Sequence, residues 1–280
     1  MNILDGKSTS KKILSQLKTQ VEKLNIKPCL NVIMIGDNPA SKIYVRNKAL
    51  ACKKIGISYQ EINFKNSVSE KELLAKIKEI NADNSVHGLI VQLPAPPHIK
   101  VNNILNTIDP QKDVDGFTPL NLGKMFSGES EDLVPATPGG IIRLLEEYNI
   151  DVTGMNVVVI GRSNIVGKPI ASLLINRSAT VSICHSKTKN LADYTKKADL
   201  IIAAVGIPKF LKKELIKKDI IIVDVGINKD NQGKLCGDCD FEDIKDFCKY
   251  LTPVPGGVGP MTIAQLMTNV VHAAQFYNKY

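Results

Sequence analysis

The sequence contains no tryptophan, and aromatic residues make up only 5% of its 280 positions. Its 36 lysines and arginines outnumber 28 aspartates and glutamates, yet no basic run extends beyond short lysine pairs. Proteins that bind nucleic acid need clustered basic residues or stacking aromatics, so nucleic acid is not expected as a partner. The net charge of +8 indicates a lysine-rich surface or, alternatively, attraction of an anionic ligand.

Long hydrophobic runs are also missing. No apolar stretch approaches the ~18 residues that a membrane-spanning helix requires. The opening residues, "MNILDGKSTSKK", contain no apolar signal core before a small-residue cleavage site. We therefore expect no membrane association and a cytoplasmic location.

Cysteines are few and scattered, at positions 29, 52, 184, 236, 239 and 248. Without an export signal, this distribution predicts reduced thiols. Cys236 and Cys239 form a C-x-x-C pair, but only Cys248 and His272 follow, at spacings unsuited to zinc. No metal site is predicted, and the four histidines (His87, His98, His185 and His272) are expected to be structural.

Short apolar runs alternate with segments of helical periodicity. The runs, typical of parallel strands buried on both faces, are 30–35, 86–93, 155–160, 179–184, 199–205 and 219–225. The helical segments are 8–24, 39–55, 69–81, 138–149 and 166–177. This alternation predicts an α/β fold built on parallel sheets.

A polar stretch, 116–137, interrupts the alternation and suggests a join between two α/β units. A last helix over 260–277 is expected to pack back onto the first unit. It should bury Ile263, Leu266, Met267, Val270, Val271 and Ala274, which follow helical spacing. We therefore predict two domains with a cleft between them.

The segment 157–174, "VVVIGRSNIVGKPIASLL", has the strand–turn–helix order of a dinucleotide-binding site. Its match to G-x-G-x-x-G is imperfect, because Ser163 replaces the second glycine and Gly167 comes one residue late. A packing turn is the alternative. An NAD site needs an acidic residue after the next strand, whereas "VSICHSKTKN" has none. Arg162, Ser186 and Lys187 favour the 2′-phosphate of NADP instead.

The stretch 41–48, "SKIYVRNK", places Tyr44 and Lys48 on one helix face. Tyr-x-x-x-Lys is typical of short-chain dehydrogenases, but in those proteins the glycine turn comes first. Here it follows by more than a hundred residues. That family is therefore a poor match.

Seven motifs occur together in one order: "SKIYVRNK", "VHGLIVQLPAPPH", "PQKDVDGFTPLNLG", "TPGG", "VVIGRSNIVGKP", "CHSKT" and "TPVPGGVGPMT". Across essentially the whole chain they resemble the bifunctional methylenetetrahydrofolate dehydrogenase/methenyltetrahydrofolate cyclohydrolase family. The resemblance implies a folate-binding catalytic domain over 1–120, completed by the helix at about 262–280. It further implies an NADP-binding Rossmann domain over 138–261 and a homodimer.

The resemblance also implies site residues. Lys48, Gln92 and Tyr44 are the expected catalytic residues, and Tyr44 and Gln92 would also bind the substrate with Asp115, Pro255, Gly256 and Gly257. The expected NADP-binding residues are Gly161, Arg162, Ser163, Ser186, Ile227, Gly259 and Thr262. Two departures from the family pattern are Cys239, where valine is usual, and Ala95, where a larger apolar residue is common. Because cysteine is a small buried hydrophobe of nearly the size of valine, Cys239 is not expected to change the activity, whereas Ala95 could alter the shape of the pocket slightly.

Elementary chemistry agrees with these roles. A carboxylate such as Asp115 can accept two adjacent N–H groups of a pterin, and Tyr44 can stack on an aromatic ring. Gln92 can hydrogen-bond the Lys48 amine without adding negative charge, so that an uncharged lysine can activate water. The structural alternatives are a turn for Asp113 and Asp115, a core position for Tyr44 and a tight turn for "PVPGGVGPMT".

The predicted function is NADP-dependent oxidation of methylenetetrahydrofolate and hydrolysis of the methenyl product to 10-formyltetrahydrofolate, in one-carbon metabolism. One alternative is a relative that keeps the dehydrogenase or the cyclohydrolase alone. Lys48 together with Gln92 argues against loss of the cyclohydrolase. The other is a non-catalytic dinucleotide-binding sensor. Retention of Tyr44, Lys48, Gln92 and Asp115 in one chain disfavours that reading.

Overall fold

A computed structural model describes residues 1–277 and contains two compact units, each discontinuous in sequence. One comprises residues 1–11 and 137–262, and the other comprises residues 12–136 and the described chain from 263. The sequence had assigned the first eleven residues to the other domain. They join the 137–262 unit because the short strand β1 pairs with β11 of its sheet.

The 137–262 unit is built on a six-stranded sheet in which every neighbouring pair is parallel. Across the sheet lie β1 (Asn2–Ile3), β11 (Cys248–Leu251), β8 (Ile220–Asp224), β7 (Leu200–Ala203), β5 (Asn156–Ile160) and β6 (Thr180–Cys184). The central strands β8, β7 and β5 are apolar except at Asp224 and Asn156, because helices and loops cover both faces of the sheet. This is the Rossmann-type sheet that the sequence predicted.

Helices and one hairpin complete this unit. The helical segments are α6 (Ala136–Glu147), α7 (Gly167–Asn176), α8 (Leu191–Thr195), η1 (Lys213–Leu215), α9 (Phe241–Ile244) and η2 (Lys245–Phe247). The hairpin, β9 (Asn228–Lys229) with β10 (Leu235–Cys236), is antiparallel and follows β8. It therefore extends from the edge of the sheet at which the parallel strands end.

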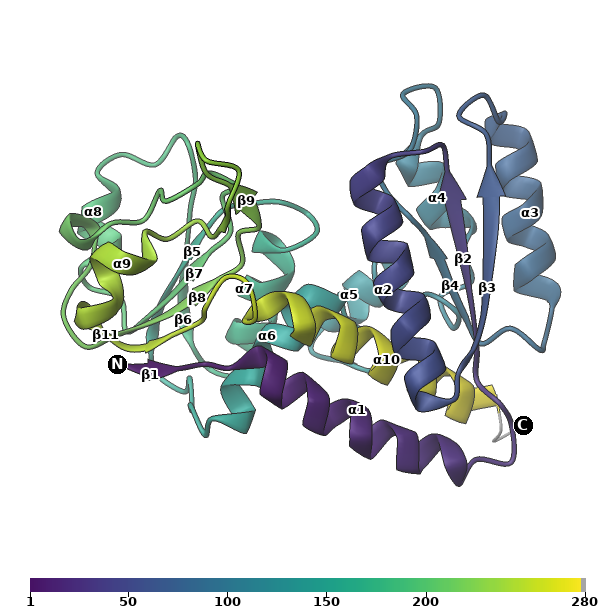
Figure 1. Cartoon of the computed structure of the whole chain (residues 1–280), viewed down its shortest axis with the longest axis horizontal. Helices are drawn as coiled ribbons and strands as arrows, with labels where there is room; N and C mark the ends of the chain where they lie inside the picture. Colours follow the sequence, from purple (N-terminus) through teal and green to yellow (C-terminus); the bar gives the residue numbers. More distant parts are fainter. Residues whose placement is uncertain (278–280) are drawn as a thin grey trace. The chain divides into compact units, whose positions relative to one another are not determined.

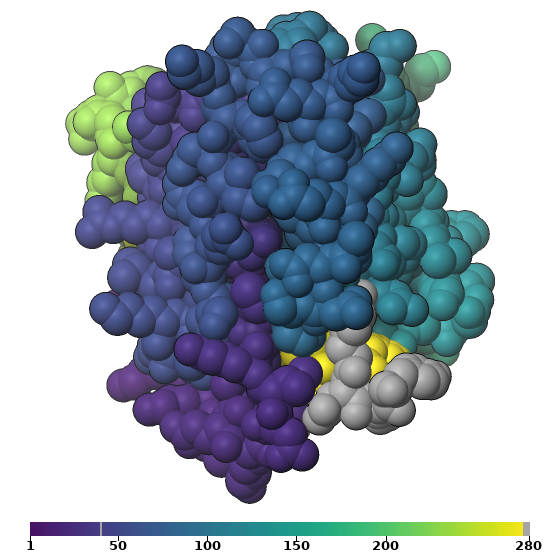
Figure 2. All heavy atoms as spheres, turned by 90° about the vertical axis from the view of Figure 1, so that its right-hand side faces the viewer, coloured from purple at the N-terminus to yellow at the C-terminus, as the bar shows by residue number. Residues whose placement is uncertain are grey.

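The other unit has a three-stranded parallel sheet in the order β3 (Ser58–Phe64), β2 (Cys29–Ile35), β4 (Gly88–Val91). Its helices are α2 (Pro39–Ile55), α3 (Glu70–Ala82), α4 (Val101–Thr107) and α5 (Pro119–Ser127). Figure 1 shows α2 and α3 on opposite sides of the sheet. The blue side chains of the α3 region make up much of the surface seen in Figure 2.

Two long helices, α1 (Gly6–Glu22) and α10 (Val258–Tyr277), each run through a boundary between the units. The predicted core positions of α10 are buried with one exception, Ile263, which is half-buried. The buried ones are Leu266, Met267, Val270, Val271 and Ala274. Periodicity thus located the buried face of this helix correctly except at its first position.

The predicted strands and helices are confirmed, but several elements were missed. The segment 116–137 is not only a join, because it contains α5. The strand β3 lies at the edge of its sheet and alternates between exposed and half-buried residues, so it lacks a continuous apolar run. Short β11 has only four residues, too few for a clear signal.

A fully buried lysine stabilises the end of α3. The Lys112 side chain has no solvent exposure, and its Nζ donates to the carbonyl oxygens of Ile80, Asn81 and Asp83 at 3.0, 2.8 and 2.6 Å. These carbonyls belong to the last turn of the helix and the residue after it, where a cation is favoured by the helix dipole. Burial lowers the pKa of this lysine.

No helix among residues 1–277 is long and apolar enough to cross a membrane. All six cysteines are free thiols, and Cys239 is buried at 2% exposure within the core under the six-stranded sheet. Cys239 thus occupies a buried apolar position that a valine would also fill.

We expect Lys112→Met to lower the free energy of unfolding by about 2–4 kcal/mol, because it leaves buried carbonyl groups without their charged donor. Urea unfolding followed by circular dichroism measures this loss. Lys78→Met, at an exposed position on α3, is the matched control and should change the free energy of unfolding by less than about 0.5 kcal/mol. Equal stability of both variants would show that Lys112 is not needed to close the helix.

Candidate functional site

Helix α2 presents a polar side chain on its buried face. The buried positions, Ser41, Val45, Lys48, Cys52 and Ile55, follow one another at helical spacing. Lys48 is only 9% exposed although lysine is rarely buried without a partner. Lys48 is the one charged residue on this buried face, whose other positions are apolar apart from Ser41, and this indicates a role other than packing.

The partner of Lys48 is Gln92, as the sequence predicted. Lys48 Nζ donates to Gln92 Oε1 at 3.0 Å, and Gln92 Nε2 donates to the carbonyl oxygen of Leu93 at 2.9 Å. Gln92 directly follows β4, and its backbone N–H bonds to Ile33 in the neighbouring strand. The glutamine is therefore fixed by the sheet. Within residues 1–277 this is the one hydrogen bond of the ammonium group, which has three donors.

Asp115 belongs to the same unit, and the charge of Lys48 affects its pKa. Burial raises the pKa of Asp115, the positive charge of Lys48 opposes that rise, and the neighbouring Asp113 adds to it. The following residue, Gly116, has φ +75°, and a Cβ atom there would lie 2.4 Å from the backbone carbon of Val134. This close approach holds the loop that carries Asp115 against the chain at Val134.

Asp113 has a different role. It is 1% exposed, and its carboxylate accepts the backbone N–H groups of Gly116 at 2.9 Å and Thr118 at 2.7 Å. It also accepts from the Asn121 side chain at 3.0 Å. The turn interpretation of Asp113 is thus confirmed. Tyr44, at 43% exposure, is not a core residue.

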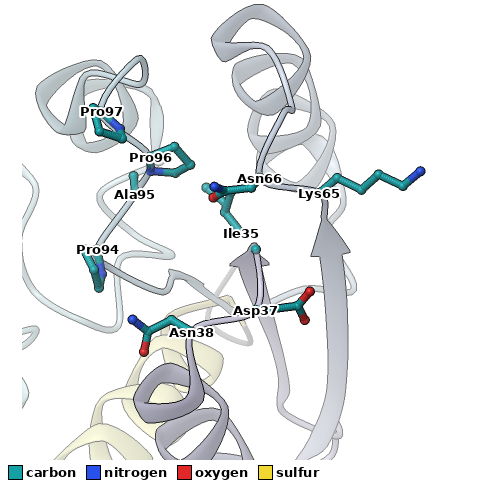
Figure 3. Close-up of a pocket in the computed structure, with 10 residues that line it drawn as sticks. Ile35, Asp37, Asn38, Lys65, Asn66, Pro94, Ala95, Pro96 and Pro97 are labelled. Carbon is teal, nitrogen blue, oxygen red and sulfur yellow. The ribbon is translucent and has the colours of Figure 1, made fainter.

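A cavity of about 470 Å³ opens where β2, β3 and β4 end. Its lining includes Asn38, Asn66 and the proline-rich segment 94–97, which follows Gln92 (Figure 3). The Lys65 side chain points away from the cavity. Ala95 lies in this lining, so the departure from the family pattern noted above falls at a cavity wall.

In the other unit, the glycine turn after β5 packs tightly. Gly161 has φ +126°, and a Cβ atom there would lie 2.1 Å from the carbonyl oxygen of Ala204, which follows β7. A Cβ atom on Gly167 would lie 2.2 Å from the carbonyl oxygen of Gly161. Both glycines are therefore required for the turn to fit between β5 and α7. The turn thus has the packing role that was considered as the alternative to cofactor binding.

The groups around this turn suit a phosphorylated dinucleotide. Ser163 Oγ accepts the N–H groups of Val166 at 3.1 Å and Gly167 at 3.3 Å, which caps the start of α7. Arg162 is exposed beside it. Ser186 and Lys187 are exposed in the turn after β6, and no acidic residue lies there to repel a phosphate. The donor set fits a ribose 2′-phosphate.

The remaining predicted residues lie after β11 and β8. Gly256 accepts the N–H of Lys7 at 2.8 Å, and a Cβ atom on Gly6 would lie 1.8 Å from the carbonyl oxygen of Gly257. Gly257 donates its N–H to the carbonyl oxygen of Pro253 at 2.8 Å, so the segment "PVPGGVGPMT" does contain the tight turn considered above. Pro255, within this turn, is exposed. Because these three residues fall in the 137–262 unit, the predicted substrate residues are divided between the units.

Thr262 Oγ1 lies 3.0 Å from Thr137 Oγ1, so it is fixed by α6. Ile227 is 54% exposed, and its Cδ1 is 3.9 Å from where a Cβ of Gly259 would be. Two predicted cofactor residues from different loops therefore lie close together.

Two buried aspartates, Asp224 at the end of β8 and Asp238 after β10, were not among the predicted site residues. Asp224 ends β8 at 3% exposure, and Asp238 is fully buried. Burial raises the pKa of Asp224 to about 6. An acidic residue closing the apolar run "IIIVD" was the available signal, because charge at the end of a buried strand needs a partner.

Comparisons with known proteins follow the same division. Residues 4–115 match the catalytic domain of tetrahydrofolate dehydrogenase/cyclohydrolase, and residues 135–278 match its NAD(P)-binding domain. The chain is 51% identical over 278 residues to the bifunctional protein FolD of Campylobacter concisus, covering 98% of each chain. The FolD protein of Streptococcus thermophilus (strain LMG 18311) is 49% identical, with 97% of each chain covered.

Solved structures agree. The bifunctional FolD methylenetetrahydrofolate dehydrogenase/cyclohydrolase of Campylobacter jejuni matches with a TM-score of 0.97 at 48% identity, covering 100% of both chains. The Trypanosoma brucei enzyme, solved with NADP cofactor and inhibitor, matches with a TM-score of 0.93 at 32% identity and covers 99% of this chain and 98% of that one. These likenesses extend over both units, and the chain accordingly belongs to the tetrahydrofolate dehydrogenase/cyclohydrolase family.

Proposed function

We propose that this protein oxidises 5,10-methylenetetrahydrofolate with NADP and hydrolyses the resulting 5,10-methenyl compound to 10-formyltetrahydrofolate. The observation that carries the proposal is the buried Lys48 whose ammonium group bonds to a neutral amide, Gln92. A lysine used only for structure would be expected to have its donors satisfied, as those of Lys112 are.

Hydrolysis needs a group that handles a proton. Water adds to the cationic methenyl carbon, the electron pair of the C=N bond returns to nitrogen, and an uncharged Lys48 amine takes the proton that this water releases. The bond from that carbon to N5 then breaks and N5 receives the proton from Lys48, which leaves the formyl group on N10. Gln92 orients the amine through its Oε1 atom and contributes no charge. With one N–H donated to Gln92, an uncharged Lys48 amine keeps a second N–H and a lone pair for the water and the substrate.

Hydride transfer needs orientation rather than a proton relay. The exposed ring of Tyr44 offers a face for an aromatic part of the folate. Asp115 accepts the adjacent amino and ring N–H groups of the pterin, which is a role for an ionised carboxylate. Both reactions use the same bound folate in this proposal.

NADP, when bound, supplies the hydride acceptor. The glycine turn at Gly161 lets the chain pass close to the pyrophosphate, and Arg162 and Ser186 bind the 2′-phosphate. Ser163, Ile227, Gly259 and Thr262 line the same site, and Pro255, Gly256 and Gly257 approach the substrate. The absence of an acid after β6 supports NADP over NAD.

Two alternatives are kept apart by one assay. A monofunctional relative would show only NADPH formation or only decay of the methenyl compound, and a non-catalytic sensor would bind NADP and show neither. A single spectrophotometric experiment that follows both signals distinguishes all three.

We also propose that the protein is a cytoplasmic homodimer. Strand β6 is an edge of the six-stranded sheet, and Ile183 on it is 39% exposed. An exposed apolar edge strand is suited to pairing with a second copy. Sedimentation equilibrium giving the mass of a single chain at micromolar concentration would contradict the dimer, and recovery in the membrane fraction would contradict the location.

Lys48→Met should abolish the cyclohydrolase, with a loss of at least 100-fold expected for a general base, and should leave NADP binding intact. The measurement is the decay of added methenyltetrahydrofolate, with an NADP titration alongside. Lys53→Met, an exposed position on the same helix, is the control and should retain activity. Hydrolysis near the wild-type rate in Lys48→Met would remove the proposed role.

Arg162→Ala should weaken NADP binding by about 1.5–3 kcal/mol, the usual contribution of a charge-assisted hydrogen bond. The loss for NAD should be much smaller, since NAD has no 2′-phosphate. Titration of both cofactors against Arg162→Ala and the exposed control Lys197→Ala tests this. Equal losses for the two cofactors would mean that Arg162 does not contact the 2′-phosphate.

Asp115→Ala should lower kcat/KM for both reactions together, because it removes binding common to their transition states. Burial raises the pKa of Asp115, so both wild-type activities should also begin to fall at a higher pH than an ordinary aspartate would give. Steady-state kinetics of each reaction over pH 4.5–8 measures both effects. Loss of one activity with the other spared would be incompatible with a shared site.

A further inference from the structure

Two buried carboxylates lie beneath the loops at the carboxyl edge of the six-stranded sheet. Asp238 Oδ2 accepts the backbone N–H groups of Val205 at 2.6 Å and Gly206 at 3.0 Å, and its Oδ1 accepts that of Ile207 at 3.1 Å. Three successive N–H groups that converge on one anion form an anion-binding nest. Here the nest is filled by the protein's own side chain.

Asp238 also reaches the hairpin that follows β8. Its Oδ1 accepts the Asn228 side-chain amide at 2.8 Å. Asp224 Oδ1 accepts the backbone N–H groups of Gly226 at 2.9 Å and of Asp238 at 2.8 Å, and its Oδ2 accepts that of Cys239 at 2.9 Å. The two aspartates therefore tie both limbs of the hairpin to the loop after β7.

The space around these carboxylates permits no other side chains. A Cβ atom on Gly237 would lie 1.8 Å from Asp224 Oδ2, and one on Gly226 would lie 2.3 Å from Asp238 Oδ1. The two carboxylates accept hydrogen bonds from six backbone N–H groups and the Asn228 amide, and among the residues that the structure describes neither forms an ion pair. Burying two carboxylates is costly, and the hydrogen bonds that surround them offset that cost.

The segments that they hold are those around the proposed cofactor site. Ala204, just before the Asp238 nest, is the residue against which Gly161 of the glycine turn packs. Ile227 lies between Gly226 and Asn228, each anchored to one of the aspartates. Asp224 in turn donates its backbone N–H to Thr252 Oγ1 at 2.7 Å, at the start of the loop that leads to Gly259.

We propose that Asp238, supported by Asp224, is a positioning residue for NADP: it holds the loop Val205–Ile207 and the backbone around Ile227 in the conformation that accepts the cofactor. The carboxylate does not contact the cofactor itself. Its oxygens accept hydrogen bonds from Val205–Ile207 and from Asn228, and these bonds hold both segments in fixed positions. The cofactor then does not have to order these segments when it binds. This inference rests on the proposed function.

Asp238→Asn is the direct test. The amide has one acceptor oxygen, so its NH2 group would face either the Val205 and Gly206 N–H groups or those of Ile207 and Asn228. We expect the dissociation constant for NADP to rise at least tenfold, and the KM for NADP to rise more than kcat falls. Hydrogen exchange should become faster in the peptides that contain Val205–Ile207.

Four control measurements keep the outcomes distinct. Asp240→Asn makes the same charge change two residues away and should bind NADP like the wild type. Cyclohydrolase activity without cofactor, with Lys48 and Gln92 in the other unit, should stay within twofold in Asp238→Asn, and circular dichroism verifies that its sheet unit is folded. Wild-type protein that fails to bind NADP would refute the proposed function rather than this role.

A folded Asp238→Asn variant that binds NADP within twofold of the wild type would overturn the proposal, whether or not its loops exchange faster. If that variant does not fold, Asn228→Ala removes a single donor from Asp238 and leaves the carboxylate in place. The expected rise in the NADP dissociation constant is then about threefold, by the loss of one modest hydrogen bond. Unchanged affinity in a folded Asn228→Ala would equally overturn it.

Discussion

The structure depends on one constraint, that a charge taken out of water must be surrounded by hydrogen-bonding groups. Three carbonyl oxygens surround the Lys112 ammonium group, and two N–H groups and an amide bind the Asp113 carboxylate. Asp224 and Asp238 are held by backbone N–H groups and one amide. In each case the charge lies where strands or helices end and backbone groups would otherwise lack partners.

Lys48 differs from these residues in a way that matters for function. It is buried like Lys112, but its hydrogen bond in the described chain goes to one side-chain amide. The Lys112 ammonium group donates to three backbone carbonyls, whereas Lys48 donates to Gln92 alone among the described residues. The same comparison separates Asp113, whose acceptors are occupied by its own turn, from Asp115 two residues later, whose pKa is raised by burial and lowered by the Lys48 charge.

Parallel sheets bring these groups to common edges. Because all strands of a parallel sheet end on the same side, the residues after β2, β3 and β4 line one cavity, which includes the segment that follows Gln92. The loops after β5, β7 and β8 likewise meet at one edge, where Gly161 packs against Ala204 and Asp238 joins two further loops. Residues far apart in the sequence thus form a site through strand direction alone.

Much of this was determined by the sequence by itself. The apolar runs located the central strands, helical spacing located α2, α3 and α10, and the ordered motifs identified the family and paired Lys48 with Gln92. Such features are local, or are carried by residue types whose chemistry has few alternatives. The short strand β11 and the edge strand β3 were not predictable, because their residues are selected by neighbours rather than by their own pattern.

Only the tertiary structure decided which of two similar residues does what. The motif "KDVDG" presents Asp113 and Asp115 as near equals, and hydrogen bonds to Gly116 and Thr118 distinguish them. The run "IIIVD" indicated that Asp224 needs a partner, but nothing in either segment reveals that Asp224 and Asp238 bind backbone groups of the same loops. The first eleven residues join the 137–262 unit because β1 pairs with β11, in which each residue lies 248 positions from its partner in the chain (Asn2 with Tyr250, Ile3 with Leu251). Contacts of that range depend on how the whole chain packs, which no local pattern specifies.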